Sequence, residues 1–255
     1  MAETIKLSKQ QQRLLGLVYK FRFITIPSIA KVLNIRNDST HEAIKPLVNQ
    51  GLLVRVYNQS WRIDRRPAYF YLSKLGVTTV RKLLDLPDKA VNTIYNDYKA
   101  SPDFITECLA NLECYISVKK SLPENSVIRM RTELNRFNLF PKYKPDLYIS
   151  TPEGKETIIF VVPDKLPYFV NKRLDEYFEY SEEEGWNGKF PTMGFVLKDK
   201  RSKLGFLYKT QQKLESMGYD EDEIEILATD TTSLLLGTNP GWSSAISPTK
   251  FTKII

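Results

Sequence analysis

Residues 51–76 read GLLVRVYNQSWRIDRRPAYFYLSKLG, and this stretch decides the fold of the first half of the chain. Apolar and polar residues alternate in LLVRVYN (52–58), and AYFYLSKLG (68–76) returns as a second extended segment. The polar residues between these segments end in a proline, which favours a turn, so the stretch predicts a β-hairpin. Gly51 is placed to end a helix that precedes the hairpin.

Three helices are expected before this hairpin. Ser8 is placed to cap the first, which runs to about residue 19, and a short extended piece follows at 23–26. Pro27 suits the first turn of the second helix, which ends near Asn34. The third helix ends before Gly51; its expected capping residues are Asn37, Asp38 and Ser39, and a kink or an irregular turn is expected at Pro46.

The order of these elements is that of a winged helix-turn-helix. A further helix, VTTVRKLLDL (77–86), closes the domain. In this layout the third helix enters the major groove of DNA and the hairpin touches the flanking backbone. The fold therefore predicts a partner, double-stranded DNA.

The distribution of charge agrees with such a partner. Residues 1–100 contain 17 Lys and Arg against 7 Asp and Glu, a net charge of +10, whereas residues 101–255 contain 20 against 23, a net of −3. A basic half joined to a mildly acidic half indicates that the first half meets a polyanion and the second does something else.

Nine residues are candidates for contact with DNA. For three of them another explanation is as good as contact with DNA: helix capping for Asn37 and Ser39, and a plain surface position for His41. The hairpin candidates are Arg55, Arg62, Arg65 and Arg66, and those on the third helix are Asn37, Ser39, Thr40, His41 and Lys45.

Composition and single residue types exclude several other classes. The chain of 255 residues is 42% hydrophobic and 26% charged, which is typical of a globular protein. We find no signal peptide and no apolar run long enough to span a bilayer, so a cytoplasmic location without membrane association is expected. Cys108 and Cys114 are too far apart along a helix for a disulfide. With His41 as its single histidine, the chain lacks the parts of a multi-histidine zinc site.

The second half alternates helices and strands in the order αβββαβαβ. The expected division is a winged-helix domain at 1–86, a linker at 87–101, a second domain at 102–230 and a tail at 231–255. The expected helices are 103–122, 167–181 and 201–218, and the expected strands are 126–134, 145–151, 156–162, 190–198 and 223–230.

This order, with Pro145 and Asp146 opening the middle strand of the meander, is similar to the PD-(D/E)XK nuclease-like fold. The resemblance implies a divalent-cation site in which Asp146 is the first acid and Glu107 or Glu113 supplies a helix acid. The fold also has a second acid on the next strand and a lysine two residues after it. At that place this chain has only Asp164 and Lys165, which are adjacent, and Lys172 is another candidate for the lysine. Mg²⁺ is implied only if this nuclease function holds, and DNA binding requires no cofactor.

A winged helix followed by such a domain resembles the replication-relaxation family of plasmid and integrative-element proteins. The resemblance rests on GLLVRVYN and YFYLSKLG in the first half, and on KPDLYIS, TIIFVVPDK and KRLDEYFEY in the second. It implies a DNA-binding protein of a mobile element that acts in replication or mobilisation. It also implies a homodimer and contacts with replication or transfer proteins.

Three functions therefore stay open. The first choice is a DNA-binding protein whose nuclease-like domain has an incomplete site and serves dimerisation or partner contact. The second is a metal-dependent endonuclease or nickase that uses Asp146, a helix glutamate, Asp164 and Lys165. The third is a transcriptional regulator, such as an autoregulating antitoxin. Tyr168, Tyr177 or Tyr180 as a nicking nucleophile is the least favoured chemistry.

Overall fold

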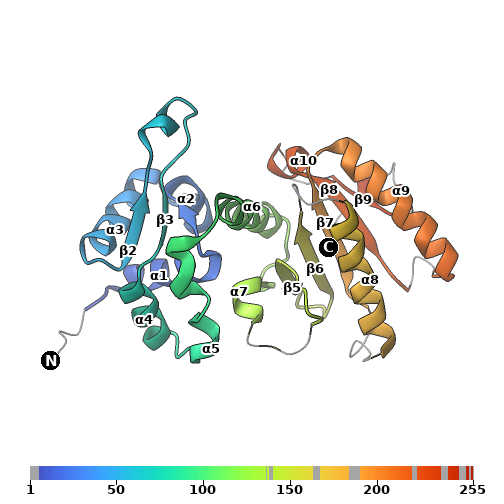
Figure 1. Cartoon of the computed structure of the whole chain (residues 1–255), viewed down its shortest axis with the longest axis horizontal. Helices are drawn as coiled ribbons and strands as arrows, with labels where there is room; N and C mark the ends of the chain where they lie inside the picture. Colours follow the sequence, from blue (N-terminus) through green and yellow to red (C-terminus); the bar gives the residue numbers. More distant parts are fainter. Residues whose placement is uncertain are drawn as a thin grey trace. The chain divides into compact units, whose positions relative to one another are not determined.

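The computed structural model divides the chain into two compact units, residues 1–112 and 113–255, with the boundary inside helix α6 (Figure 1). The structure describes residues 6–135, 137, 140–162, 167–183, 190–219, 223–236, 241–246, 251, 252 and 254.

The first unit packs its helices around a three-stranded sheet. The strand order is β1-β3-β2, and both pairs are antiparallel. Helix α1 contacts α3, α4 and β3, and α2 packs on α3. The elements are α1 (Lys9–Phe21), β1 (Ile24–Thr25), α2 (Ile26–Leu33), α3 (Asn37–Asn49), β2 (Leu53–Val56), the 3-10 helix η1 (Gln59–Arg62), β3 (Tyr69–Leu72), α4 (Lys74–Leu83), α5 (Asp88–Val91), the 3-10 helix η2 (Ile94–Lys99) and α6 (Pro102–Lys119).

This arrangement is a winged helix-turn-helix, as the sequence predicts. The predicted cap of α1 is confirmed, because Ser8 Oγ accepts from the amide of Gln11 at 3.2 Å and Gln11 Oε1 accepts from the amide of Ser8 at 2.8 Å. Thr25 caps α2 in a similar way, accepting the amide hydrogen of Ser28. Local hydrogen bonding therefore sets where both helices begin.

The ends of residues 51–76 are joined by one serine. Ser73 Oγ donates to the carbonyl of Gly51 at 2.6 Å and accepts from the amide of Gly76 at 3.0 Å, which caps α4. A Cβ atom on Gly76 would lie 2.0 Å from the carbonyl oxygen of Leu52. The glycine therefore allows α4 to approach the start of β2.

Three expectations for this unit need correction. Helix α3 runs unbroken through Pro46. Its N-cap is Arg36, with no side-chain cap, so Asn37, Asp38 and Ser39 are helical residues.

The third correction concerns residues 87–101, which were expected to be a linker. They form α5 and η2, and Ala90, Val91 and Ile94 are buried. Burial raises the pKa of Asp97, and the ion pair with Arg22 offsets part of this rise. These apolar and ionic contacts make the segment part of the first unit.

The second unit is built on one mixed sheet, ordered β10-β9-β8-β7-β6-β5-β4. Its outer pairs are antiparallel, and β6, β7 and β8 are parallel to one another. The elements are β4 (Val127–Met130), α7 (Arg131–Leu134), β5 (Leu147–Ser150), β6 (Glu156–Val161), α8 (Pro167–Glu183), β7 (Thr192–Leu197), α9 (Lys200–Met217), β8 (Ile226–Asp230), α10 (Thr231–Leu236), β9 (Trp242–Ser244) and β10 (Phe251–Thr252).

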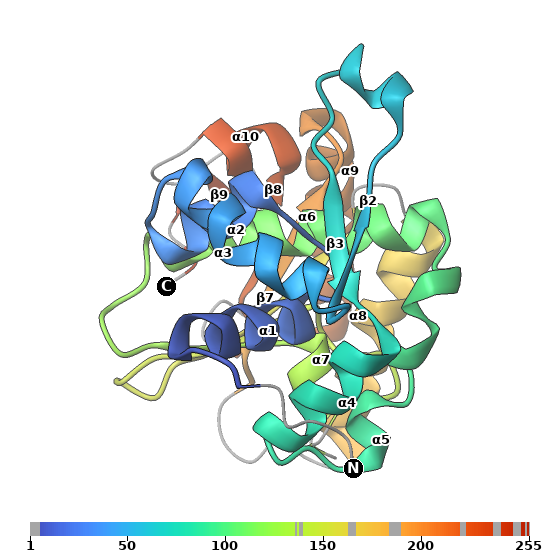
Figure 2. The same ribbon diagram turned by 90° about the vertical axis from the view of Figure 1, so that its left-hand side faces the viewer.

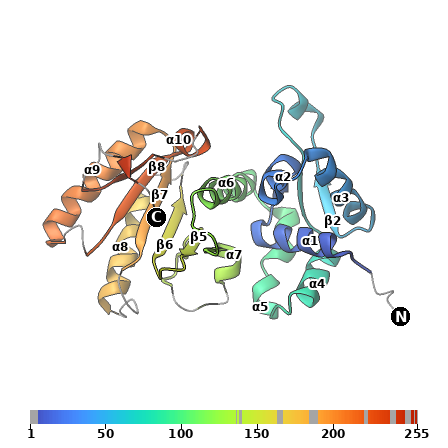
Figure 3. The same ribbon diagram turned by 180° about the vertical axis from the view of Figure 1, so that it is seen from behind.

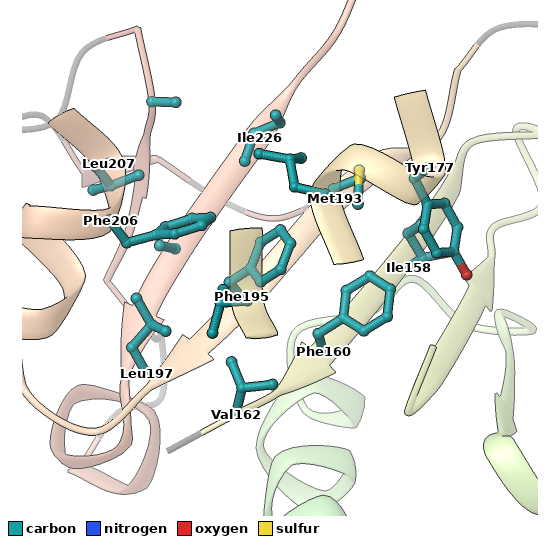
Figure 4. Close-up of a cluster of buried hydrophobic side chains, with 14 of the residues drawn as sticks. Ile158, Phe160, Val162, Tyr177, Met193, Phe195, Leu197, Phe206, Leu207 and Ile226 are labelled. Atoms are coloured by element: carbon teal, nitrogen blue, oxygen red, sulfur yellow. The ribbon is translucent and has the colours of Figure 1, made fainter. Parts of the chain in front are cut away.

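Helices α8 and α9 cover one face of this sheet (Figure 3). Alternate residues of the parallel strands, including Ile158, Phe160 and Phe195, point into a shared apolar cluster (Figure 4). Tyr177 of α8 and Phe206 of α9 close the cluster from the helix side. The period of two along each strand therefore places the core on this face.

The predicted order αβββαβαβ is present, but two details were wrong. The first expected strand ends at Met130, and α7 takes the remaining residues. Residues 231–255 are not simply a tail, because β9 pairs with β8 and Trp242 is buried. A Cβ on Gly194 would lie 3.0 Å from the Trp242 ring, so the missing side chain leaves room for the indole. The nuclease-like assignment of this unit stays a prediction.

Candidate nucleic-acid interface

The β2–β3 hairpin, called the wing here (residues 53–72), projects beyond the helices of its unit (Figure 2). All four of its predicted arginines, Arg55, Arg62, Arg65 and Arg66, are exposed. Arg66 Nε lies 3.5 Å from Asp64, and the guanidinium of Arg55 lies 5.4 Å from the centre of the Tyr57 ring. Both contacts are at the surface, where ion pairs contribute little, so the cost of exchanging them for phosphate is small.

Aromatic side chains stiffen the outer half of the wing. Trp61 stacks on Tyr69, with 5.7 Å between ring centroids and 30° between ring planes. Tyr57 meets Trp61 edge to face at 6.2 Å. Asn58 caps the 3-10 helix by accepting the amide of Ser60 at 3.0 Å. These contacts hold the arginines on a defined scaffold, which lowers the entropy that binding would cost.

Helix α3 presents four of its five predicted residues to solvent: Asn37, Ser39, His41 and Lys45. Thr40 is the exception and a correction. It is fully buried beside Ile44 and Leu47 in the helical pattern, and its hydroxyl donates to the Arg36 carbonyl at 3.1 Å. Because Asn37 is already helical, residue 40 falls on the inner face and is not available to a groove.

The exposed face of α3 also carries two acids, Asp38 and Glu42, that were not among the predicted contacts with DNA. Asp38 pairs with Arg36 at 3.2 Å, and Glu42 lies 3.4 Å from the Nδ1 atom of His41. Carboxylates can accept from the exocyclic amine of cytosine in the major groove, although they repel phosphate. The face is therefore mixed in charge, whereas the wing has four exposed arginines and one exposed aspartate.

In the second unit, Asp146 is completely buried between β4 and β6. Its Oδ1 lies 2.6 Å from a guanidinium nitrogen of Arg131, and its Oδ2 accepts the amide hydrogen of Val161 at 2.9 Å. Burial and the nearby Asp146 raise the pKa of the Cys114 thiol. Both carboxylate oxygens thus serve contacts inside the protein, which is the pattern of a structural ion pair.

The remaining candidates for a metal site are spread over three parts of the sequence. Asp164 and Lys165 lie outside the described residues. Glu107 lies in the first unit and Glu113 in the second, both on α6. Within the described ranges, no three His, Cys, Asp or Glu side chains come together as a possible metal site. Mg²⁺ needs several oxygen ligands, and both oxygens of Asp146 are already engaged by Arg131 and Val161.

The tyrosines named as nucleophiles differ in access. Tyr177 is buried, burial raises its pKa, and its hydroxyl donates to the carbonyl of Tyr143 at 3.3 Å. Tyr168 is exposed at the start of α8, and Tyr180 is partly exposed. The position of Tyr177 therefore argues against a role as a nucleophile.

A comparison with protein families matches the replication-relaxation model to residues 15–193. This range contains the whole wing and continues through Asp146 to β7. The chain belongs to the replication-relaxation family. The comparison with curated proteins gives no match for this replication-relaxation protein.

Solved structures of winged-helix type give weaker similarities. A MarR mutant from E. coli complexed with operator DNA is 22% identical, with 46% of this chain and 77% of that chain covered and a TM-score of 0.29. The adhesin competence repressor AdcR from Streptococcus pyogenes is 28% identical, with 41% and 75% covered and a TM-score of 0.28. At these TM-scores, the similarities assign no function to the replication-relaxation protein.

Two features of the interface were not predicted. The aromatic support of the wing, Tyr57, Trp61 and Tyr69, could have been noticed as three aromatic residues flanking a basic turn. The exposed Ile63 at the tip could not be distinguished from a core residue by its type alone.

The described helices include none with the length and apolar character needed to cross a membrane.

Proposed function

We propose that this replication-relaxation protein binds duplex DNA through its first unit. Helix α3 lies in the major groove, and the wing contacts the flanking backbone. The observation that carries the proposal is the set of four exposed arginines on a hairpin stiffened by Trp61 and Tyr69.

The physical basis of binding is release of counterions from the phosphates. Each phosphate neutralised by an arginine lowers the slope of log K against log salt by about 0.9 for B-DNA. The net charge of +10 on residues 1–100 favours the approach of any duplex. Sequence preference would come from Asn37, Ser39 and His41, which are exposed along the first turns of α3.

The second unit is proposed to serve contacts with a second copy or with replication and transfer proteins. Its mildly acidic sequence makes it a poor partner for phosphate, and its buried Asp146 is held by Arg131. The family places the protein in replication, and a plasmid or mobile element is the proposed setting. No cofactor is required for this function.

The test compares the full chain with an Arg65→Ala/Arg66→Ala variant. The dissociation constant of a labelled 24-base-pair duplex is measured by fluorescence anisotropy at several salt concentrations. Loss of two phosphate contacts is expected to weaken binding by roughly 10- to 100-fold at moderate salt. The negative slope of log K against log salt should become less steep by about 1.8.

A Lys82→Ala/Lys89→Ala variant is the matched control, because it removes the same charge from exposed positions of the same unit outside the wing. It should retain most of the affinity and nearly the full salt slope. Equal losses in both double variants would show that binding depends on net charge alone. Unchanged affinity in the Arg65/Arg66 variant would remove the wing from the interface.

An endonuclease is the second candidate, favoured by the element order of the second unit and by the position of Asp146 before β5. A plasmid nicking assay with Mg²⁺ or Mn²⁺ compares the wild type with Asp146→Ala. Metal-dependent nicking that disappears in a folded Asp146→Ala protein would establish the nuclease. The ion pair of Asp146 with Arg131 leads us to expect no nicking by either protein.

A further inference from the structure

The tip of the wing carries an apolar side chain with no packing role. Ile63 is 85% exposed, whereas the next most exposed large aliphatic side chain among the described residues, Leu75, is 47% exposed. The wing projects from its unit, so the tip lies far from the core of that unit (Figure 2). The core of the first unit therefore does not explain an isoleucine at this position.

The backbone nevertheless holds Ile63 in a defined place. Its amide donates to the carbonyl of Ser60 at 3.2 Å, closing the 3-10 helix. The amide of Arg66 donates to the carbonyl of Trp61 at 2.9 Å on the other side of the tip. Since Trp61 itself stacks on Tyr69, the isoleucine stands on a braced support.

The surroundings of Ile63 indicate what it meets. Arg62, Arg65 and Arg66 lie within three residues of it, and all three are exposed. An apolar protein groove or a neutral surface would not be matched by three cations, whereas the minor groove combines phosphates on both sides with apolar base faces inside. The partner that fits both the cations and the isoleucine is duplex DNA.

We propose that Ile63 is a wedge that enters the minor groove and partly unstacks one base step while the arginines hold the two backbones. The inference rests on the proposed function, because it needs the wing to lie on DNA. Isoleucine is one of the side chains that can open a base step in this way. Flexible pyrimidine–purine steps such as TA are the expected position of insertion, because they unstack at least cost.

The test measures unwinding of DNA, which does not require knowledge of the binding site. A closed circular plasmid is relaxed by a topoisomerase while saturated with the full-length protein, and its linking number is read from a gel after the protein is removed. The wild type is expected to change the linking number, because an opened base step is untwisted. The Ile63→Ala variant, also at saturation, is expected to lose this change, and its duplex affinity should fall by about tenfold.

The variants separate the wedge from simple binding. Leu75→Ala removes an exposed side chain of the same size outside the wing and should unwind the plasmid as the wild type does, and Ile63→Met should retain most of the effect. Ile63 is so exposed that circular dichroism melting should be unchanged in Ile63→Ala. Binding without unwinding by the wild type, or equal unwinding by Ile63→Ala, overturns the wedge and leaves the proposed function standing. Absence of duplex binding by the wild type overturns both.

Discussion

The wing of the first unit and the Asp146 region of the second both carry charged residues that the sequence selects as functional, yet they differ in burial. The wing arginines are exposed, and the contacts of Arg55 with Tyr57 and of Arg66 with Asp64 are weak surface contacts. Asp146 is buried, with one oxygen on Arg131 and the other on the Val161 amide. An exposed charged side chain loses its water only when it binds a ligand. A buried and paired charge has lost its water on folding, and its partner inside the protein already occupies it.

A second ion pair shows that a charged residue becomes structural because it is buried, and not because it lies in the second unit. Arg22 and Asp97 of the first unit form an ion pair that joins the end of α1 to η2. The Arg22 guanidinium also lies 4.7 Å from the centre of the Phe104 ring. Each unit thus uses one arginine and one buried aspartate to fix segments that are distant in sequence, and neither pair is aimed at solvent.

The largest effect that would test this comparison is expected from Asp146→Ala. Removing the carboxylate takes the partner from the buried Val161 amide and from the partly exposed Arg131 guanidinium, which is expected to destabilise the second unit by about 3 kcal/mol. Hydrogen exchange of peptides covering β5 and β6, together with urea unfolding, would measure the loss. The amides of β6 should lose most of their protection.

Glu179→Ala is the matched control for this experiment, since it removes the same charge from an exposed position on α8. It should leave exchange in β6 unchanged. If Asp146→Ala unfolded at the same urea concentration as the wild type, the carboxylate would not be structural, and the comparison between the two regions would fail.

The parts predictable from sequence are those with local causes. The alternation in residues 51–76 predicts the hairpin, and Ser8 as a capping residue predicts the start of α1. The pairing of β9 with β8 and the contact of Arg131 with Asp146 join residues through the fold of the sheet, so no local pattern reveals them. The burial of Thr40 could have been found, because it lies four and seven residues before Ile44 and Leu47.

An intermediate effect is expected from Gly76→Ala. Gly76 ends the stretch YFYLSKLG, on which the resemblance to the family rests in the first unit. The variant tests whether this residue has a structural role, as Asp146 has, or is available to a ligand, as the wing arginines are. A methyl group there would meet the carbonyl of Leu52, so either α4 or β2 must shift. The expected cost is about 1–3 kcal/mol in the unfolding free energy of the first unit. Gly16→Ala is the control, because a Cβ there has no atom within 4 Å, and it should not destabilise α1.

The smallest effects should come from two neighbours on α3 that were predicted to share one role. Thr40→Val keeps the shape but removes the hydroxyl that donates to Arg36, which should lower stability by about 1 kcal/mol and leave duplex affinity within twofold. Lys45→Ala should do the reverse: the stability stays, the affinity falls a few-fold, and the negative slope of log K against log salt becomes less steep by about 0.9. Thermal melting and fluorescence anisotropy on the same samples measure both quantities. A loss of affinity in Thr40→Val larger than in Lys45→Ala would mean that exposure does not decide which residues of α3 meet DNA.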